Sequence, residues 1–141
     1  MVRYVLDTNA MSALMRGDLR VAARLNAVGR AVVGVPHPVL AEIAYGIERL
    51  PRSKRREGLQ ERFDLVRTEL ARVPWTDEVS ERFGTVKAEL ERRGRRIEDF
   101  DAAIAAHALT EEAVLVTANR DDMARVPGLK VEDWTEPRTG R

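Results

Sequence analysis

Short valine-rich apolar runs alternate along this chain with longer segments whose apolar residues recur at helical spacing. The runs predict strands at residues 2–6, 31–35, 114–117 and 130–134, with a short strand or extended link at 73–75. The longer segments predict helices at residues 10–15, 18–25, 37–50, 53–71, 77–93 and 101–109. Strands that alternate with helices pair in parallel and carry helices on both faces of the sheet. The sequence therefore predicts one α/β domain at residues 1–134 and a frayed tail at 135–141.

The composition agrees with this prediction and excludes several classes of protein. The 141 residues are enough to bury a core without crosslinks. The chain has no cysteine, which excludes a disulfide framework, a zinc–thiolate site and a thiol nucleophile. No segment resembles a signal peptide or a membrane span, so we expect a cytoplasmic protein without membrane contact. The formal net charge is only +1, so any nucleic-acid binding must come from local charge clusters.

Asp7 lies where the first expected strand meets a turn into a helix. Ligands of open α/β sheets bind at the carboxyl ends of the strands, which is where Asp7 is expected. Asp is also a favoured helix N-cap, so Asp7 could serve only to cap the helix that begins near Asn9. Other acids in similar settings favour a role beyond capping.

Asp101 and Glu42 are the next acidic candidates. Asp101 shares a helix face with Ile104, Ala105 and Ala108, and a carboxylate on a core-facing stripe is costly unless other groups satisfy it. The alternative is an acid that only favours the start of its helix through the helix dipole. Glu42 lies at the border of the buried stripe of helix 37–50, where it could reach a cleft or remain a boundary residue.

A further acidic cluster, Asn119, Asp121 and Asp122, follows the strand expected at residues 114–117. Its residues are also ordinary turn formers. If residues 120–123 form one helical turn, Asn119 and Asp122 share a side and Asp121 points elsewhere. We therefore expect Asp122, acting through water, to complete the acidic set.

Together these acids predict a metal site. Carboxylates that share a cleft repel each other and raise one another's pKa. A hard divalent cation such as Mg²⁺ removes this conflict and binds carboxylates, waters and substrate phosphates. The sequence contains no glycine-rich phosphate loop of the GxxxxGK[ST] or GxGxxG type. The pattern therefore favours metal-assisted hydrolysis of phosphodiester bonds.

Five sequence segments occur together in an order typical of one family. They are YVLDTNAMS, AEIAYGI, GRRIEDFDAAIAAHAL, LVTANRDD and VPGLKVEDW, and they span about residues 2–134. In this combination the chain resembles a PIN-domain protein, and more narrowly a VapC-type ribonuclease toxin of a bacterial toxin–antitoxin pair. The resemblance implies a PIN-like α/β/α sandwich around a mostly parallel sheet. It also implies a Mg²⁺- or Mn²⁺-dependent endoribonuclease whose products carry a 3′-hydroxyl and a 5′-phosphate.

The resemblance also implies site residues and partners. Asp7, Glu42 and Asp101 match catalytic acids of the family, and Asp7 and Asp101 match its main metal ligands. The matching polar residues are Thr8, Asn9, Ser12, Thr117 and Asn119. The implied partners are an RNA substrate, a cognate VapB-type antitoxin protein and a second copy in a homodimer, which can join a larger assembly with the antitoxin. Two positions depart from the family pattern: many PIN proteins have an acid where this chain has Asn119, and VapC-like chains usually have an aromatic residue where it has Met123.

Two other functions remain open at this point. An aspartyl-phosphate phosphatase would use Asp7 as its nucleophile, but the DxD motif of those enzymes is DTN here, with Asn9 in place of the second acid. A catalytically silent PIN-like binding module would use the acids only for stability or for binding a regulator.

The basic clusters and the aromatic residues leave further alternatives open. The clusters are either solvated faces or contacts for RNA phosphates; they comprise Arg52, Lys54, Arg55 and Arg56, and Arg92, Arg93, Arg95 and Arg96. His107 is interpreted as a packing residue because no Ser or Cys nucleophile motif accompanies it. Trp75 and Trp134 are expected in the core or at its rim.

Overall fold

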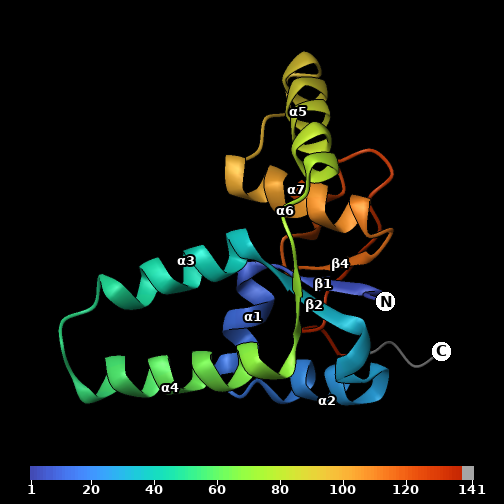
Figure 1. Cartoon of the computed structure of the whole chain (residues 1–141). Coiled ribbons are helices and arrows are strands. Elements are labelled where there is room, and N and C mark those ends of the chain that lie inside the picture. Colours follow the sequence, from blue (N-terminus) through green and yellow to red (C-terminus); the bar gives the residue numbers. More distant parts are fainter. Residues whose placement is uncertain (138–141) are drawn as a thin grey trace.

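A computed structural model describes residues 1–137 and places a five-stranded parallel sheet at the centre of the molecule (Figure 1). The strand order is β3-β2-β1-β4-β5. The strands are β1 (Tyr4–Leu6), β2 (Val33–Pro36), β3 (Ala71–Val73), β4 (Val114–Val116) and β5 (Val131–Glu132). Residues 138–141 of the expected tail lie outside the described residues.

Helices cover both faces of this sheet, so the expected α/β/α sandwich is confirmed. The helices are α1 (Thr8–Met15), α2 (Leu19–Val28), α3 (His37–Glu48), α4 (Lys54–Glu69), α5 (Asp77–Arg92), α6 (Asp99–Thr110) and α7 (Arg120–Met123). In Figure 1, α2 and α4 lie on one side of the sheet and α5 and α6 on the other, while α3 and α4 run side by side away from it. None of the described helices combines the length and the hydropathy that a membrane crossing requires.

The core forms where the apolar strands meet the inner helix faces. Val5 and Leu6 of β1, Val33 and Val35 of β2, and Leu115 of β4 are fully buried. Strands buried on both faces are expected to be continuously apolar, which explains why these short segments do not alternate.

Gly34 allows β2 to approach its neighbour closely. A Cβ atom at this position would lie 2.7 Å from a methyl carbon of Val73 and 3.1 Å from one of Val2. Only glycine leaves the two valine side chains undisturbed here, because real Cβ contacts are not that short.

The third strand is shifted from its predicted position. As a strand, the prediction of residues 73–75 is wrong beyond Val73, because β3 covers Ala71–Val73 and ends where Val73 pairs with Pro36. Residues 74–75 form a link, which was the alternative. Beyond Pro36 the chain turns into α3, so β2 offers no further strand partner. Pro74 also lacks the N–H needed to extend the ladder.

The two tryptophans lie in different environments. Trp134 is 1% exposed and packs against Tyr4 with the two rings tilted, whereas Trp75 is 46% exposed, at the rim. The predicted packing role of His107 is consistent with the structure. Its ring is fully buried, its Nδ1 lies 2.8 Å from the Ala103 carbonyl oxygen, and it meets Trp75 edge to face.

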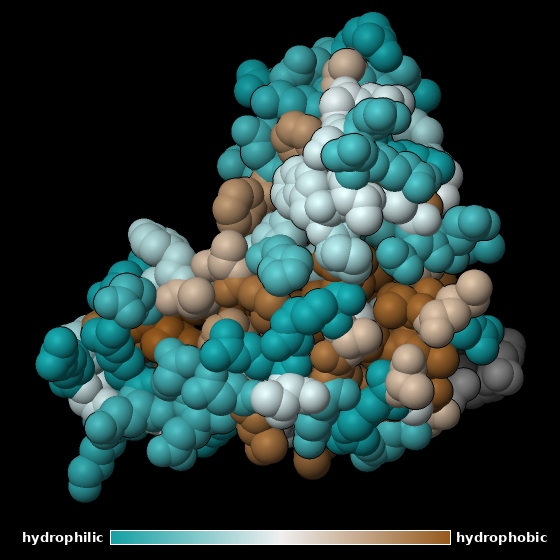
Figure 2. Space-filling view, in the orientation of Figure 1, coloured by the Kyte–Doolittle hydropathy of each residue, from teal (hydrophilic) through white to brown (hydrophobic). Residues whose placement is uncertain are grey.

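The surface differs between the ends of the molecule and its middle. On the face shown in Figure 2, hydrophilic residues cover the outer parts of α5 and of the α3–α4 pair. Hydrophobic residues reach the surface mainly between these two regions.

Candidate active site

The strand order reverses between β1 and β4, and Asp7 lies at this point. The chain moves from β1 outward to β2 and β3, then returns across the sheet to β4. Such a reversal opens a crevice at the carboxyl ends of the strands. The Asp7 N–H donates to the Val116 carbonyl oxygen at 3.0 Å, which fixes the end of β1 against the end of β4.

Asp7 is a helix cap and also part of an acidic cluster, so the two interpretations of this residue are compatible. Its Oδ1 accepts from the Ala10 N–H at 2.8 Å, which caps α1. The residue is only 7% exposed, and this burial is the main cause that raises the pKa of its carboxyl. Hydrogen bonds from Thr117 and Ala10 lower the pKa, while the charges of Glu42 and Asp133 raise it.

Asp101 lies in the first turn of α6, with Ile104, Ala105 and Ala108 buried on the same helix. Burial raises the pKa of Asp101 to about 6, and the negative charges of Glu42, Asp7, Glu98 and Asp122 add to this effect, in that order. The structure therefore brings Glu42, Asp7 and Asp122 near enough to Asp101 for their charges to disfavour its ionisation.

A cavity of about 570 Å³ opens over this cluster. Its lining residues are Glu42, Arg96, Ile97, Glu98, Asp99, Phe100, Asp101 and Asp122. We call it the acidic cleft. Asp7 lies behind this lining. It is buried, yet it is close enough for its negative charge to raise the pKa of Asp101.

Glu42 belongs to the cleft through α3. It is half-buried, and its Oε1 accepts a hydrogen bond from the Thr8 hydroxyl at the start of α1. Thr8 therefore orients an acid contributed by another helix. Asn9 is exposed and Ser12 half-buried on α1, and neither belongs to the cleft lining.

Residues 120–123 form the expected helical turn, and Asp122 lines the acidic cleft while Asp121 does not. The predicted shared side of Asn119 and Asp122 is wrong. Asn119 lines a separate hollow together with Asp121. The reason is that Asn119 precedes α7 with a non-helical backbone, so helical spacing does not apply to it. Its N–H donates instead to the Thr117 hydroxyl at 2.9 Å.

The donor set fits a hard divalent cation by its chemistry. Within residues 1–137, no three His, Cys, Asp or Glu side chains are already arranged to hold a metal ion. The cleft nevertheless gathers carboxylate oxygens, and mutual repulsion and burial raise the pKa of Asp101 there. A divalent cation would relieve this repulsion, and Asp7 and Asp101 are the acids whose pKa is raised, chiefly by burial and further by neighbouring negative charges.

Sequence reasoning missed several residues of the cleft. Glu98, Asp99 and Phe100 were not singled out, and Arg96 was weighed only as part of a basic cluster. Acids at the start of a helix usually interact with its dipole, so Glu98 and Asp99 carried no separate signal. The dense run of acids around Asp101 was the available indication.

Comparisons with known proteins agree with this geometry. A sequence model of the PIN domain family matches residues 4–129. Ribonuclease VapC2 from Rickettsia felis is 31% identical over 138 residues, which cover 93% of this chain and 97% of that protein. The tRNA(fMet)-specific endonuclease VapC from Shigella flexneri is 31% identical over 140 residues, covering 96% of this chain and 100% of the relative.

The fold comparison leads to the same group. The crystal structure of VapBC2 from Rickettsia felis, bound to a DNA fragment from their promoter, contains a chain with 30% sequence identity and a TM-score of 0.84. The match covers 95% of this chain and 99% of that one. The protein therefore belongs to the PIN domain family and, within it, to the VapC ribonucleases.

Proposed function

We propose that this protein is a Mg²⁺- or Mn²⁺-dependent endoribonuclease and the toxin of a toxin–antitoxin pair. One observation carries the proposal: acids from α3, α6 and α7 meet above Asp7 in one cleft, where the pKa of Asp101 is raised to about 6. Such a set of acids suits metal-assisted phosphodiester hydrolysis. Relatives named ribonuclease VapC support the choice of RNA as substrate.

In this proposal Asp7 and Asp101 would hold the metal ion, and Glu42 and Asp122 would contribute to the site through water. The ion, when bound, lowers the pKa of the attacking water and neutralises charge on the phosphate. The protein orients the acids, because Ala10 and Thr117 hold Asp7 and Thr8 holds Glu42. Glu42 is then placed to accept the proton of the attacking water.

The reaction is an in-line displacement at phosphorus. Water adds to the phosphorus as the bond to the 3′-oxygen breaks. The leaving 3′-oxygen takes a proton from solvent water, so the products carry a 3′-hydroxyl and a 5′-phosphate.

The proposed partners follow from the same cleft. A VapB-type antitoxin would inhibit the enzyme by placing a cationic group, such as an arginine, among the carboxylates. A complex with the antitoxin in which the cleft stays fully open to RNA would count against this inhibition.

We also propose that this protein forms a homodimer, because two-fold dimers are the commonest oligomers and the family resemblance implies one. We propose the cytoplasm as its location. Sedimentation that finds only monomer at micromolar concentration would contradict the dimer.

Asp7→Asn tests the catalytic part of the proposal. Asn is as good an N-cap as Asp, so the variant keeps the bond from the Ala10 N–H and removes only the charge. We expect RNA cleavage with Mg²⁺ or Mn²⁺ in the wild type, loss of cleavage in EDTA, and a folded but inactive variant. Wild-type activity in Asp7→Asn would refute the role of Asp7 as a metal ligand.

The same assay separates the other candidate functions. A phosphatase that uses Asp7 would form a phosphoenzyme that can be trapped, whereas the proposed hydrolysis forms none. A silent module would cleave no RNA with any metal. Cleavage that is unaffected by a chelator would contradict the metal-dependent mechanism.

A further inference from the structure

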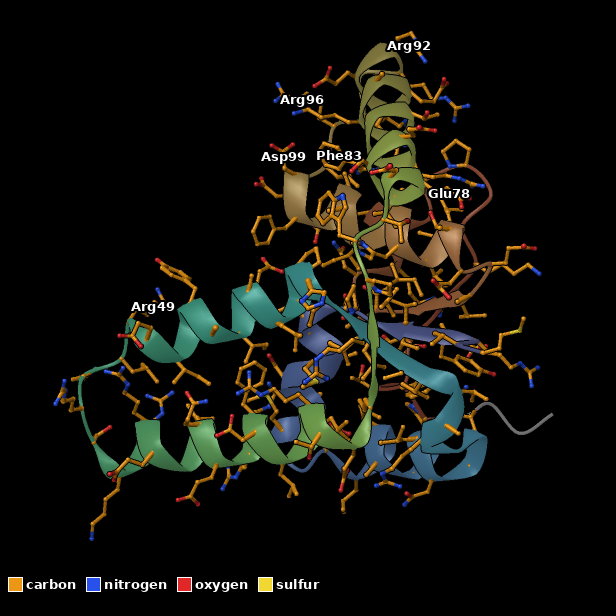
Figure 3. All side chains as sticks on the ribbon, viewed as in Figure 1. Arg49, Glu78, Phe83, Arg92, Arg96 and Asp99 are labelled. Carbon is orange, nitrogen blue, oxygen red and sulfur yellow. The ribbon has the colours of Figure 1, made fainter. Side chains whose placement is uncertain are left out.

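The acidic cleft contains one basic side chain and one exposed aromatic ring. Arg96 precedes α6, and Phe100 lies in the first turn of that helix. Both line the cleft beside Glu42, Asp101 and Asp122. In Figure 3, Arg96 and Asp99 lie on the same side of the molecule, near the start of α6, whereas Arg92 lies at the far end of α5.

The guanidinium of Arg96 has no close ion pair within residues 1–137. Its nearest carboxylate is that of Glu91, 4.0 Å away, and its side chain is 77% exposed. By contrast, Arg92 and Arg93 share Glu89 at 3.1 and 2.9 Å. Arg96 therefore keeps its donors available for an anion, and Arg prefers the bidentate geometry that a phosphate offers.

Phe100 connects the acidic cleft to an apolar hollow. It is 44% exposed and lines both cavities. The second cavity has a volume of about 340 Å³ and is also lined by Trp75 and Phe83. Asp99 lines both cavities too, with its carboxylate 3.0 Å from the Lys87 ammonium group. An apolar hollow with aromatic walls thus begins where the acid cluster ends.

A phosphate-binding side chain and a stacking surface in one cleft match the two parts of a nucleotide. Bases of single-stranded RNA are free to stack on aromatic side chains, whereas paired bases are not. An otherwise acidic cleft repels the RNA backbone, so a basic side chain inside it has a specific use. An occupant made only of apolar side chains would leave Arg96 without a ligand.

We propose that Arg96 and Phe100 form a subsite for one nucleotide of single-stranded RNA next to the acid cluster. The guanidinium of Arg96 binds the phosphate, and the ring of Phe100 stacks against the base. This inference rests on the proposed function and goes beyond it, because it names the residues that hold the substrate. Both residues are positioning residues rather than proton donors or acceptors.

The salt dependence of RNA binding tests Arg96. Affinity for a short fluorescein-labelled single-stranded RNA is measured by anisotropy at several salt concentrations, in the full-length Asp7→Asn protein to prevent cleavage. One lost phosphate contact reduces the slope of log K against log salt by about 0.7 for single strands. We expect this reduction in Arg96→Ala and a nearly unchanged slope in Arg96→Lys. Arg95→Ala is the matched control, because Arg95 is the adjacent basic residue and does not line the cleft.

Substitutions of Phe100 test the stacking surface. Stacking contributes about 1–3 kcal/mol per base, so Phe100→Leu should weaken binding about 5- to 150-fold without changing the salt slope. Phe100→Tyr should keep most of the affinity. Tyr45→Leu is the matched control, since Tyr45 is an exposed aromatic residue on α3 outside the cleft. In cleavage assays we expect Arg96→Ala and Phe100→Leu to raise KM more than they lower kcat.

The outcomes separate this inference from the proposed function. If the wild type cleaves no RNA with Mg²⁺ or Mn²⁺, the proposed function fails. If it cleaves RNA, but Arg96→Ala and Phe100→Leu behave like their controls, the subsite is refuted. If Phe100→Leu changes the sedimenting mass or antitoxin affinity and not RNA affinity, the ring belongs to a protein interface and the inference is overturned. Melting temperatures show whether Arg96→Ala or Phe100→Leu is misfolded. If one of them is, the conservative variants Arg96→Lys and Phe100→Tyr still test the subsite, because it is refuted if they bind RNA much more weakly than the wild type.

Discussion

Replacing Asp101 with Asn should stabilise the protein while it abolishes cleavage. The carboxylate of Asp101 is half-buried among the charges of Glu42, Asp7, Glu98 and Asp122. Asn has nearly the same shape and no charge, so the substitution removes the cost of burying a charge and the repulsion from its neighbours without leaving a cavity. A residue that costs stability and is needed for activity is typical of a catalytic site.

The structure sets the size of this effect. The pKa of Asp101 is raised from 3.8 to about 6, and one pKa unit corresponds to about 1.4 kcal/mol. The upper limit of the gain at pH 8 is therefore about 3 kcal/mol. Solvent in the open cleft screens the charges, and Asn loses about 0.3–1 kcal/mol of favourable interaction with the helix dipole. We expect a net gain of about 1–2 kcal/mol, or a rise in Tm of about 3–8 °C.

The pH dependence follows from the direction of this pKa shift. Because the folded state holds the proton of Asp101 to about pH 6 and the unfolded chain loses it near 3.8, wild-type stability falls between these values as pH rises. The advantage of Asp101→Asn should therefore be absent below about pH 4 and complete above about pH 6.

Urea unfolding at pH 4, 6 and 8 measures this difference. Asp99→Asn is the control, because Asp99 lies on the same helix with its charge balanced by Lys87 at 3.0 Å. We expect no gain in the control. Added Mg²⁺ should raise the Tm of the wild type and have little effect on Asp101→Asn, since a ligand stabilises only the state that binds it. A variant that is no more stable than the wild type at pH 8 would refute the electrostatic argument.

Three further predictions concern other parts of the structure. Asp122→Asn should lower the cleavage rate more than Asp121→Asn, because Asp122 lines the cleft and Asp121 does not; the opposite order in a kinetic assay would exclude Asp122 from the site. Gly34→Ala should destabilise the protein by about 1–3 kcal/mol in urea unfolding, because the new Cβ would lie 2.7 Å from Val73, and an unchanged midpoint would contradict this close approach. His107→Gln should reduce the loss of stability between pH 7 and pH 5, because burial lowers the pKa of His107 and charging it favours the unfolded chain, and an identical pH profile would exclude such a contribution.

Much of the fold was predictable because it depends on local patterns. Continuous valine-rich runs predict buried parallel strands, and the spacing of apolar residues predicts the helices between them. Strand ends that carry Asp7 and Thr117 were predictable for the same reason, since parallel strands end at the same edge. Helical spacing also singled out Asp101 and Glu42, and the family resemblance added their roles as catalytic acids.

Element boundaries and neighbours required the tertiary structure. The end of β3 at Val73 depends on the end of β2 at Pro36, because the two strands pair there. The two residues are far apart in the sequence, so no local pattern predicts where the pairing stops. Asn119 and Asp122 lie on different sides because the backbone at Asn119 is not helical. Such features arise from pairing and packing between distant segments, and no local propensity encodes them.

The acidic cleft shows the same division between sequence and structure. The sequence by itself determined which residues carry charge and which segments bring them to the sheet edge. The pairs of Arg92 and Arg93 with Glu89 also follow from helical spacing of three and four residues. Only the tertiary structure, by contrast, decided that Arg96 and Phe100 line the cleft with Asp101. The physical reason is that Arg96 and Phe100 lie near the start of α6, whereas Glu42 and Asp122 lie on α3 and α7. The distances between these side chains are fixed only when the helices pack on the sheet.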